Sequence, residues 1–163
     1  MSSSPAVIPL TRPVTMPRRF GNYVLLRKLA EGGMAEIFLA KQLGAEGFER
    51  DVVIKCMLDH FTQSRDFVSM FLDEARLAAR LHHPNIVQIS DLGVADNRYY
   101  ICMEYLAGED LDAVITAAHS RVEKVPIAIA ARIILSALEG LASSFSGSMA
   151  GALNGSDAHS IRE

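Results

Sequence analysis

The sequence is poor in cysteine, with only two in 163 residues. Cys56 and Cys102 both lie in apolar, strand-like runs, whereas a secreted disulfide scaffold carries more cysteines, placed in loops. We therefore expect buried free thiols in a reducing cytoplasm. No Cys/His cluster has the spacing of a zinc site, so we expect no structural metal.

Long apolar runs and an excess of one charge are missing as well. No run of about 18 apolar residues occurs, so we expect no membrane span in this chain. The net charge is −3, from 16 Lys and Arg against 19 Asp and Glu, which gives no basic patch for nucleic acid or an anionic membrane. With 50% apolar and 21% charged residues, the chain predicts one soluble, cytoplasmic globular domain.

Both ends of the chain differ in composition from its middle. Residues 1–19 contain several prolines and no apolar segment of the kind a signal peptide needs, so we expect a disordered leader. Residues 143–163 are rich in Ser, Gly and Ala without a sustained period, which predicts a disordered or aberrant tail.

The middle of the chain predicts an α+β fold. Strand patterns occupy residues 23–29, 35–42 and 52–57, a helical period covers 64–81, and two further strands fill 86–94 and 98–104. Two helices follow at 111–120 and 126–141, the first capped by Asp110. This order predicts a lobe with a five-stranded antiparallel sheet and one helix over 20–107. The first helices of a second lobe follow at 108–142.

Two charged residues stand where apolar ones are expected. The helix at 64–81 has an apolar arc, and Glu74 lies near the centre of that arc. The arc consists of Phe67, Met70, Phe71, Leu77, Ala78 and Leu81. Lys55 lies between Ile54 and Cys56 in a strand that we expect to be buried on both faces. Buried charges need partners, so the two residues predict an ion pair, although each side chain reaching solvent separately remains an alternative.

A turn rich in small residues lies between the first two strands, with the sequence Leu-Ala-Glu-Gly-Gly-Met-Ala-Glu-Ile at 29–37. Small residues let the backbone approach a ligand and present N–H groups to anionic oxygens. The turn leads into a strand and not a helix, which excludes a Rossmann site, and the ending of a Walker motif is absent.

These features together resemble the amino-terminal lobe of protein kinases, and most closely bacterial Ser/Thr kinases of the eukaryotic type. The resemblance covers residues 20–141. It rests on the turn at 29–37, Val-Val-Ile-Lys at 52–55, Glu74, His-Pro-Asn-Ile-Val at 83–87 and the hinge-like Met-Glu-Tyr-Leu-Ala-Gly at 103–108.

The resemblance implies an ATP site and a protein substrate. Lys55 would hold the α- and β-phosphates and Glu74 would orient it, while the backbone of the turn would cover the triphosphate. The turn comprises Leu29, Ala30, Glu31, Gly32, Gly33, Met34, Ala35, Glu36 and Ile37. Met103 would be the gatekeeper, and the Glu104 carbonyl and Leu106 backbone would bond adenine. Leu29, Ile37 and Val53 would contact the base. Ala30 and Ala35 depart from the family, which has glycine at both positions.

The catalytic motifs of the family do not appear after residue 142. His-Arg-Asp, Asp-Phe-Gly and Ala-Pro-Glu are absent, and with them the Mg²⁺ ligands and the base. Three interpretations stay open: a kinase whose catalytic half is missing from this truncated chain, a non-catalytic module that binds nucleotide or a partner, and a frameshifted gene remnant. The apolar helix at 126–142 would lack a second lobe to cover it, so we expect self-association through it.

Overall fold

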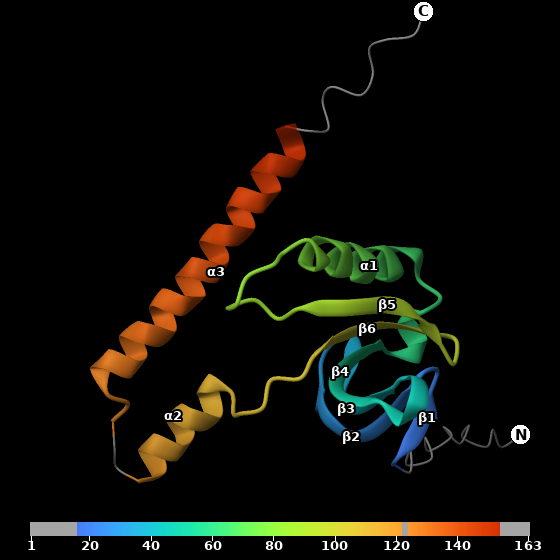
Figure 1. The fold of residues 1–163 in the computed structure, drawn as a ribbon, viewed down its shortest axis with the longest axis horizontal. Coiled ribbons are helices and arrows are strands. Elements are labelled where there is room, and N and C mark those ends of the chain that lie inside the picture. The colour runs from blue at the N-terminus through green and yellow to red at the C-terminus, as the bar shows by residue number, and fades with distance from the viewer. Residues whose placement is uncertain (1–15, 122–123, 154–163) are drawn as a thin grey trace, which may run out of the picture.

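The computed structural model describes residues 16–121 and 124–153, which form a curled antiparallel sheet followed by helices (Figure 1). The sheet order is β1-β2-β3-β4-β6-β5. The strands are β1 (Arg18–Phe20), β2 (Tyr23–Glu31), β3 (Ala35–Leu43), β4 (Glu49–Met57), β5 (Ile89–Ala95) and β6 (Arg98–Glu104). The helices are α1 (Arg65–Ala79), α2 (Leu111–Ser120) and α3 (Ile127–Leu153). The predicted α+β kinase-like lobe is confirmed, with six strands in place of five.

The additional strand β1 lies where a leader was expected. Gly21 has a φ of 56°, a left-handed conformation that glycine adopts at low cost, and it reverses the chain so that Phe20 pairs with Tyr23. Phe20 is fully buried. Residues 18 and 19 therefore belong to the sheet, whereas residues 1–15 lie outside the described part of the chain.

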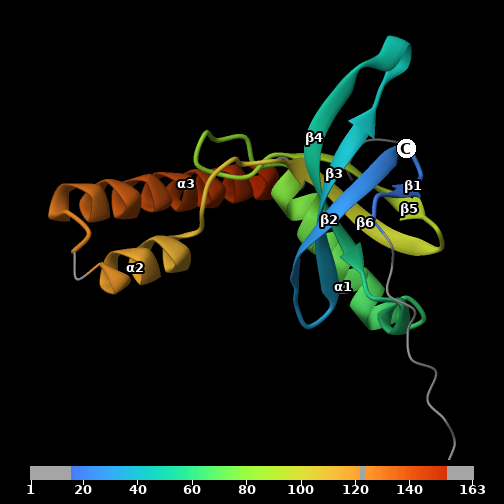
Figure 2. The same ribbon diagram turned by 90° about the horizontal axis from the view of Figure 1, so that it is seen from below.

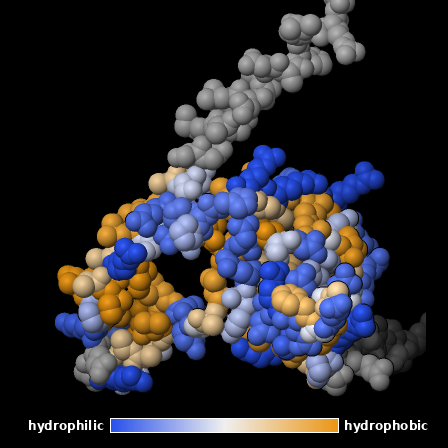
Figure 3. Space-filling model, in the orientation of Figure 1, coloured by the Kyte–Doolittle hydropathy of each residue, from blue (hydrophilic) through white to orange (hydrophobic). Residues whose placement is uncertain are grey.

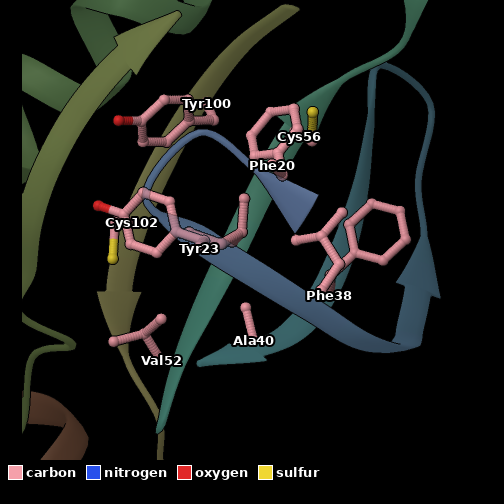
Figure 4. Packing of buried hydrophobic residues seen from close by; sticks show 10 residues of the cluster. Phe20, Tyr23, Phe38, Ala40, Val52, Cys56, Tyr100 and Cys102 are labelled. Carbon is pink, nitrogen blue, oxygen red and sulfur yellow. The ribbon is translucent and has the colours of Figure 1, made fainter. Parts of the chain in front are cut away.

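The sheet has two apolar faces because side chains alternate along each strand. On β4, Val52, Ile54 and Cys56 point into the curl of the sheet, where they pack with Phe20, Tyr23 and Tyr100 (Figure 4). Both Cys56 and Cys102 are buried free thiols, as predicted. Val53 and Lys55 lie on the other face and are only half-buried. The expectation that this strand is buried on both faces was therefore only partly right, because the second face is covered at Met57 but only in part at Val53 and Lys55.

Helix α1 packs on the outer face of the sheet through a narrow stripe. Phe71 and Ala75 are buried against Ala35, Met57 and Ile101. Met70 and Leu77, by contrast, are 55% and 66% exposed. The predicted buried arc was therefore right only in part, since Phe71 is buried while the described chain leaves Met70 and Leu77 exposed. Glu74 lies on the exposed side.

The two later helices begin as predicted, but α3 is longer. The Asp110 side chain accepts a hydrogen bond from the Ala113 backbone N–H at 2.7 Å, which confirms the cap. Helix α3 follows Pro126 and continues to Leu153, beyond the predicted end at 141. Residues 142–153 contain alanine, methionine and leucine, which favour helix, besides serines and glycines, which favour it less. Residues 154–163 of the expected tail lie outside the described residues.

Helix α3 projects away from the sheet (Figures 1 and 2). It exposes apolar side chains between Ile127 and Phe145. Apolar residues gather over α2 and α3 in the space-filling view (Figure 3). Residues 127–145 are long and apolar enough to cross a membrane, contrary to our expectation. Arg132 and Glu139 break the continuous apolar run, but two charges leave the mean hydropathy of the segment high. Core helices of soluble domains meet the same criterion, so length and composition alone do not assign α3 to a membrane.

Candidate functional site

The centre of the candidate site is an ion pair between β4 and α1. Lys55 Nζ lies 2.6 Å from Glu74 Oε1. The Lys55 side chain is 21% exposed, and its ammonium also lies 5.8 Å from the centre of the Phe71 ring on α1. The ring face attracts a cation, so Phe71 and Glu74 together direct the lysine toward the helix. The structure brings together the two charges that the sequence paired.

Apolar side chains surround Lys55 on the same face of the sheet. Ile37 on β3 stands opposite Lys55, and Met103 on β6 stands opposite Val53. Because directly opposed residues of antiparallel strands share a face, these side chains form one surface with the lysine. Ile37, Val53 and Met103 are each half-buried, so this surface is covered only in part.

The turn between β2 and β3 lies at the end of this face. The Gly32 N–H donates to the Ala35 carbonyl at 2.8 Å and closes the turn. A Cβ added at Gly33 would meet no atom within 4 Å, and one added at Gly32 would meet only the Ala35 oxygen at 3.9 Å. The described chain therefore leaves space above both glycines. A register shift between Lys28 and Ala30 makes Leu29 a bulge residue at the entrance to the turn.

The predicted hinge follows the last residue of β6. The Glu104 N–H donates to the Gln88 carbonyl at 3.0 Å, and the Glu104 carboxylate accepts from the Gln88 N–H at 2.8 Å. Leu106 lies beyond the strand and is exposed. Glu104 is thus fixed to the segment before β5, which positions the start of the connection to α2.

Sequence reasoning missed two sets of contacts beside the site. Arg98 at the start of β6 binds the turn residue Glu36, and no periodicity marks an arginine after a hairpin as structural. Asn85 was quoted only as part of a motif, yet its side-chain amide donates to the Ser136 carbonyl at 2.8 Å and to a Glu139 carboxylate oxygen at 3.1 Å. These bonds attach α3 to the segment between α1 and β5.

The chemistry available in the described residues is binding of an anion by a lysine next to an apolar surface. Among residues 16–121 and 124–153, no group of three or more His, Cys, Asp or Glu side chains is placed to hold a metal ion. The side chains described here thus do not fit the Mg²⁺ that the resemblance implies, and no step through it is assigned.

Comparison with known proteins agrees with this geometry. A family model described as "Protein kinase domain" matches residues 23–146. "Tyrosine-protein kinase MasK" of Myxococcus xanthus is 57% identical over 143 residues, which are 86% of this chain and 22% of that protein. "Serine/threonine-protein kinase PrkC" of Bacillus subtilis is 42% identical over 97 residues, covering 60% of this chain and 14% of that protein. The chain thus spans less than a quarter of either relative's length.

The solved structures that the fold resembles are protein kinase domains as well. The crystal structure of the Mycobacterium tuberculosis PknI kinase domain matches with a TM-score of 0.62 at 24% identity, covering 81% of this chain and 51% of that domain. At 24% sequence identity this structural match shows a shared fold and nothing further.

Proposed function

The chain belongs to the protein kinase family, and we propose that it forms the ATP-binding part of a kinase that phosphorylates serine or threonine hydroxyls of proteins. The observation that carries this proposal is the Lys55–Glu74 pair on a half-covered apolar face. A lysine held by a carboxylate offers a fixed positive charge to phosphate oxygens, and apolar neighbours suit a purine ring.

The proposed ligand is ATP, with its base and its phosphates on different parts of the face. Ile37, Val53 and Met103 contact the adenine, and the Glu104 carbonyl and the Leu106 backbone bond its edge. Lys55 contacts the α- and β-phosphates. Supporting this arrangement, the turn leaves open space above Gly32 and Gly33, where a nucleotide can approach the backbone.

We propose further that this chain alone does not transfer a phosphoryl group. The sequence contains no His-Arg-Asp or Asp-Phe-Gly motif, and phosphoryl transfer depends on the base and metal ligands that those motifs supply. The proposed Ser/Thr preference agrees with the name of the relative PrkC, a serine/threonine-protein kinase, whereas the relative MasK is named a tyrosine-protein kinase. Phosphoamino-acid analysis of the product of a complete kinase domain carrying this lobe would decide between the two hydroxyl classes.

Isothermal titration calorimetry with ATP tests the binding proposal. We expect weak binding by the chain, with a Kd on the order of 1 mM, and loss of binding in Lys55→Met. Lys41→Met is the matched control, because Lys41 also pairs with carboxylates, those of Glu49 and Asp51, but at the other end of the same strands. Equal binding by wild type and both variants would overturn the proposed site. Phosphate transfer to a protein substrate that Lys55→Met abolishes would overturn the proposed inactivity.

A further inference from the structure

Arg98 occupies a largely buried position that joins three segments of the chain. Its side chain is 13% exposed. Nη2 donates to Glu36 Oε2 at 2.8 Å, and Nε donates to the Met57 carbonyl at 2.7 Å and lies 2.9 Å from Asp59 Oδ1. Glu36 belongs to the turn of residues 29–37. Met57 is the last residue of β4, and Asp59 lies on the connection of residues 58–64 that leads into α1.

The second oxygen of Glu36 is also engaged. Lys28 Nζ on β2 donates to Glu36 Oε1 at 2.9 Å and forms a further ion pair with Glu31. Glu31 ends β2 and Glu36 lies at the start of β3, so Lys28 joins the two sides of the turn. Burial opposes ionisation of Glu36, but hydrogen bonds from Lys28 and Arg98 outweigh it and lower the pKa of the carboxyl. The network is therefore ionised at neutral pH.

The tip of the turn has its own link to the same connection. The Leu58 N–H donates to the Met34 carbonyl at 3.0 Å. Met34 also packs against the cluster that contains Phe71 and Ala75 of α1. Backbone and side-chain contacts thus attach the turn to the chain that leads into the helix carrying Glu74.

We propose that Arg98 is a positioning residue that holds the phosphate-facing turn, through Glu36, to the connection leading into α1. The turn and the connection then open and close together. A ligand that orders the turn also orders the start of the helix that directs Lys55. The coupling stands on the contacts of Arg98, beside the backbone link from Leu58 to Met34, whereas its use for ATP rests on the proposed function.

Hydrogen exchange of the nucleotide-free protein, read by mass spectrometry, tests the coupling. In Arg98→Met we expect the amides of residues 32–36 and of 58–62 to exchange about tenfold faster. The variant loses the hydrogen bond to Glu36 on the first side, and the hydrogen bond to the Met57 carbonyl and the ion pair with Asp59 on the second. Lys41→Met is the control, since it removes comparable ion pairs far from the turn. Unchanged exchange in either segment of Arg98→Met would overturn the proposal, and so would an increase spread evenly over all strands.

A second variant covers the case in which Arg98→Met does not fold. Glu36→Gln removes the charge that Arg98 holds at the turn and leaves the arginine its contacts with Met57 and Asp59. We expect faster exchange at 32–36 with a smaller increase at 58–62, and no change at the turn would contradict the role of the pair. Arg98→Lys keeps the charge but cannot make three directed contacts, so we expect only partial rescue.

ATP titration of the same variants separates this proposal from the proposed function. We expect Lys55→Met to lose ATP binding, while its amides at residues 32–36 exchange at the wild-type rate. A result in which neither the wild type nor any variant binds ATP, while Arg98→Met still speeds amide exchange at 32–36 and 58–62, would overturn the proposed ATP site and support the coupling. If ATP binds and Arg98→Met leaves both segments unchanged, the coupling fails and the site stands.

Discussion

Lys55 Nζ and Glu74 Oε1 are 2.6 Å apart, yet the glutamate side chain is 54% exposed while the lysine side chain is 21% exposed. A pair of this kind adds little to folding, because water screens the attraction and the side chains lose entropy. Its geometry is nevertheless specific, since Phe71 and Glu74 fix the lysine between them. The pair therefore suits orientation of a charge better than stabilisation of the fold.

The first prediction concerns the energetics of this pair. We expect Glu74→Gln to change the free energy of unfolding by less than about 1 kcal/mol and to weaken ATP binding, because Lys55 is then no longer held in place. Urea denaturation and titration calorimetry of the same samples measure the two effects. A loss of more than about 3 kcal/mol, the range of a buried pair, would contradict a surface ion pair.

The second prediction concerns the contact between α3 and the segment that precedes β5. Gly140 is buried, and a Cβ there would lie 3.3 Å from both the Asn85 carbonyl oxygen and Ile86 Cγ1. We expect Gly140→Leu to push α3 away from this segment, although leucine raises helix propensity by up to about 1 kcal/mol. Limited proteolysis near residues 82–88 should become faster. Ala137→Leu, at an exposed position of the same helix, is the control and should leave the cleavage rate unchanged.

The third prediction concerns the exposed apolar side of α3. Ile127, Ile134 and Leu138 are 87%, 60% and 54% exposed. Burying such side chains against a second copy is favourable by about 25 cal/mol per Å², so we expect self-association that grows with concentration in sedimentation equilibrium. Ile134→Glu should shift the chain toward monomer, and Arg132→Glu on the same helix should not. A monomer at all concentrations would show that this face does not bind a second copy.

The sheet was predictable from the sequence because its strands alternate or form compact apolar runs between turn residues. The Asp96–Asn97 turn between β5 and β6, where both residues have positive φ, was also marked by its polar sequence. Strand β1 was not predicted, since three residues after a proline-rich stretch carry no period. Its formation depends on pairing with β2, which is a tertiary contact.

The candidate site was predicted in part, but the reason for the prediction, burial of both charges, was wrong for Glu74. Lys55 and Glu74 were paired as buried charges, whereas Glu74 is exposed and the pair lies at an open face. The turn at 29–37 was expected from its small residues. Arg98 was not expected, because its role depends on distant partners, Glu36 and Asp59, that no local pattern connects to it.

The fourth prediction concerns two buried tyrosines at the edge of the core. The hydroxyls of Tyr23 and Tyr100 each donate to Asp91 Oδ2 at 2.8 Å. Burial, with the hydrogen bond to Asp91, raises the pKa of Tyr100 to about 12 and raises that of Tyr23 as well. The folded state thus keeps protons that the unfolded chain releases from pH 10 upward, so stability is full below pH 10 and falls as pH rises toward 12. One such group contributes a slope of about 1.4 kcal/mol per pH unit.

Tyr100→Phe removes one of the two groups, and we expect it to make the decline in unfolding free energy between pH 10 and 12 less steep. It should also cost about 1 kcal/mol at neutral pH, because the Tyr100–Asp91 hydrogen bond is lost. Denaturant melts at several pH values measure both quantities, with Tyr105→Phe as a control outside the core cluster. An unchanged slope in Tyr100→Phe would mean that this hydroxyl ionises in the folded protein as readily as in the unfolded chain. In that case the bond to Asp91 would not hold its proton.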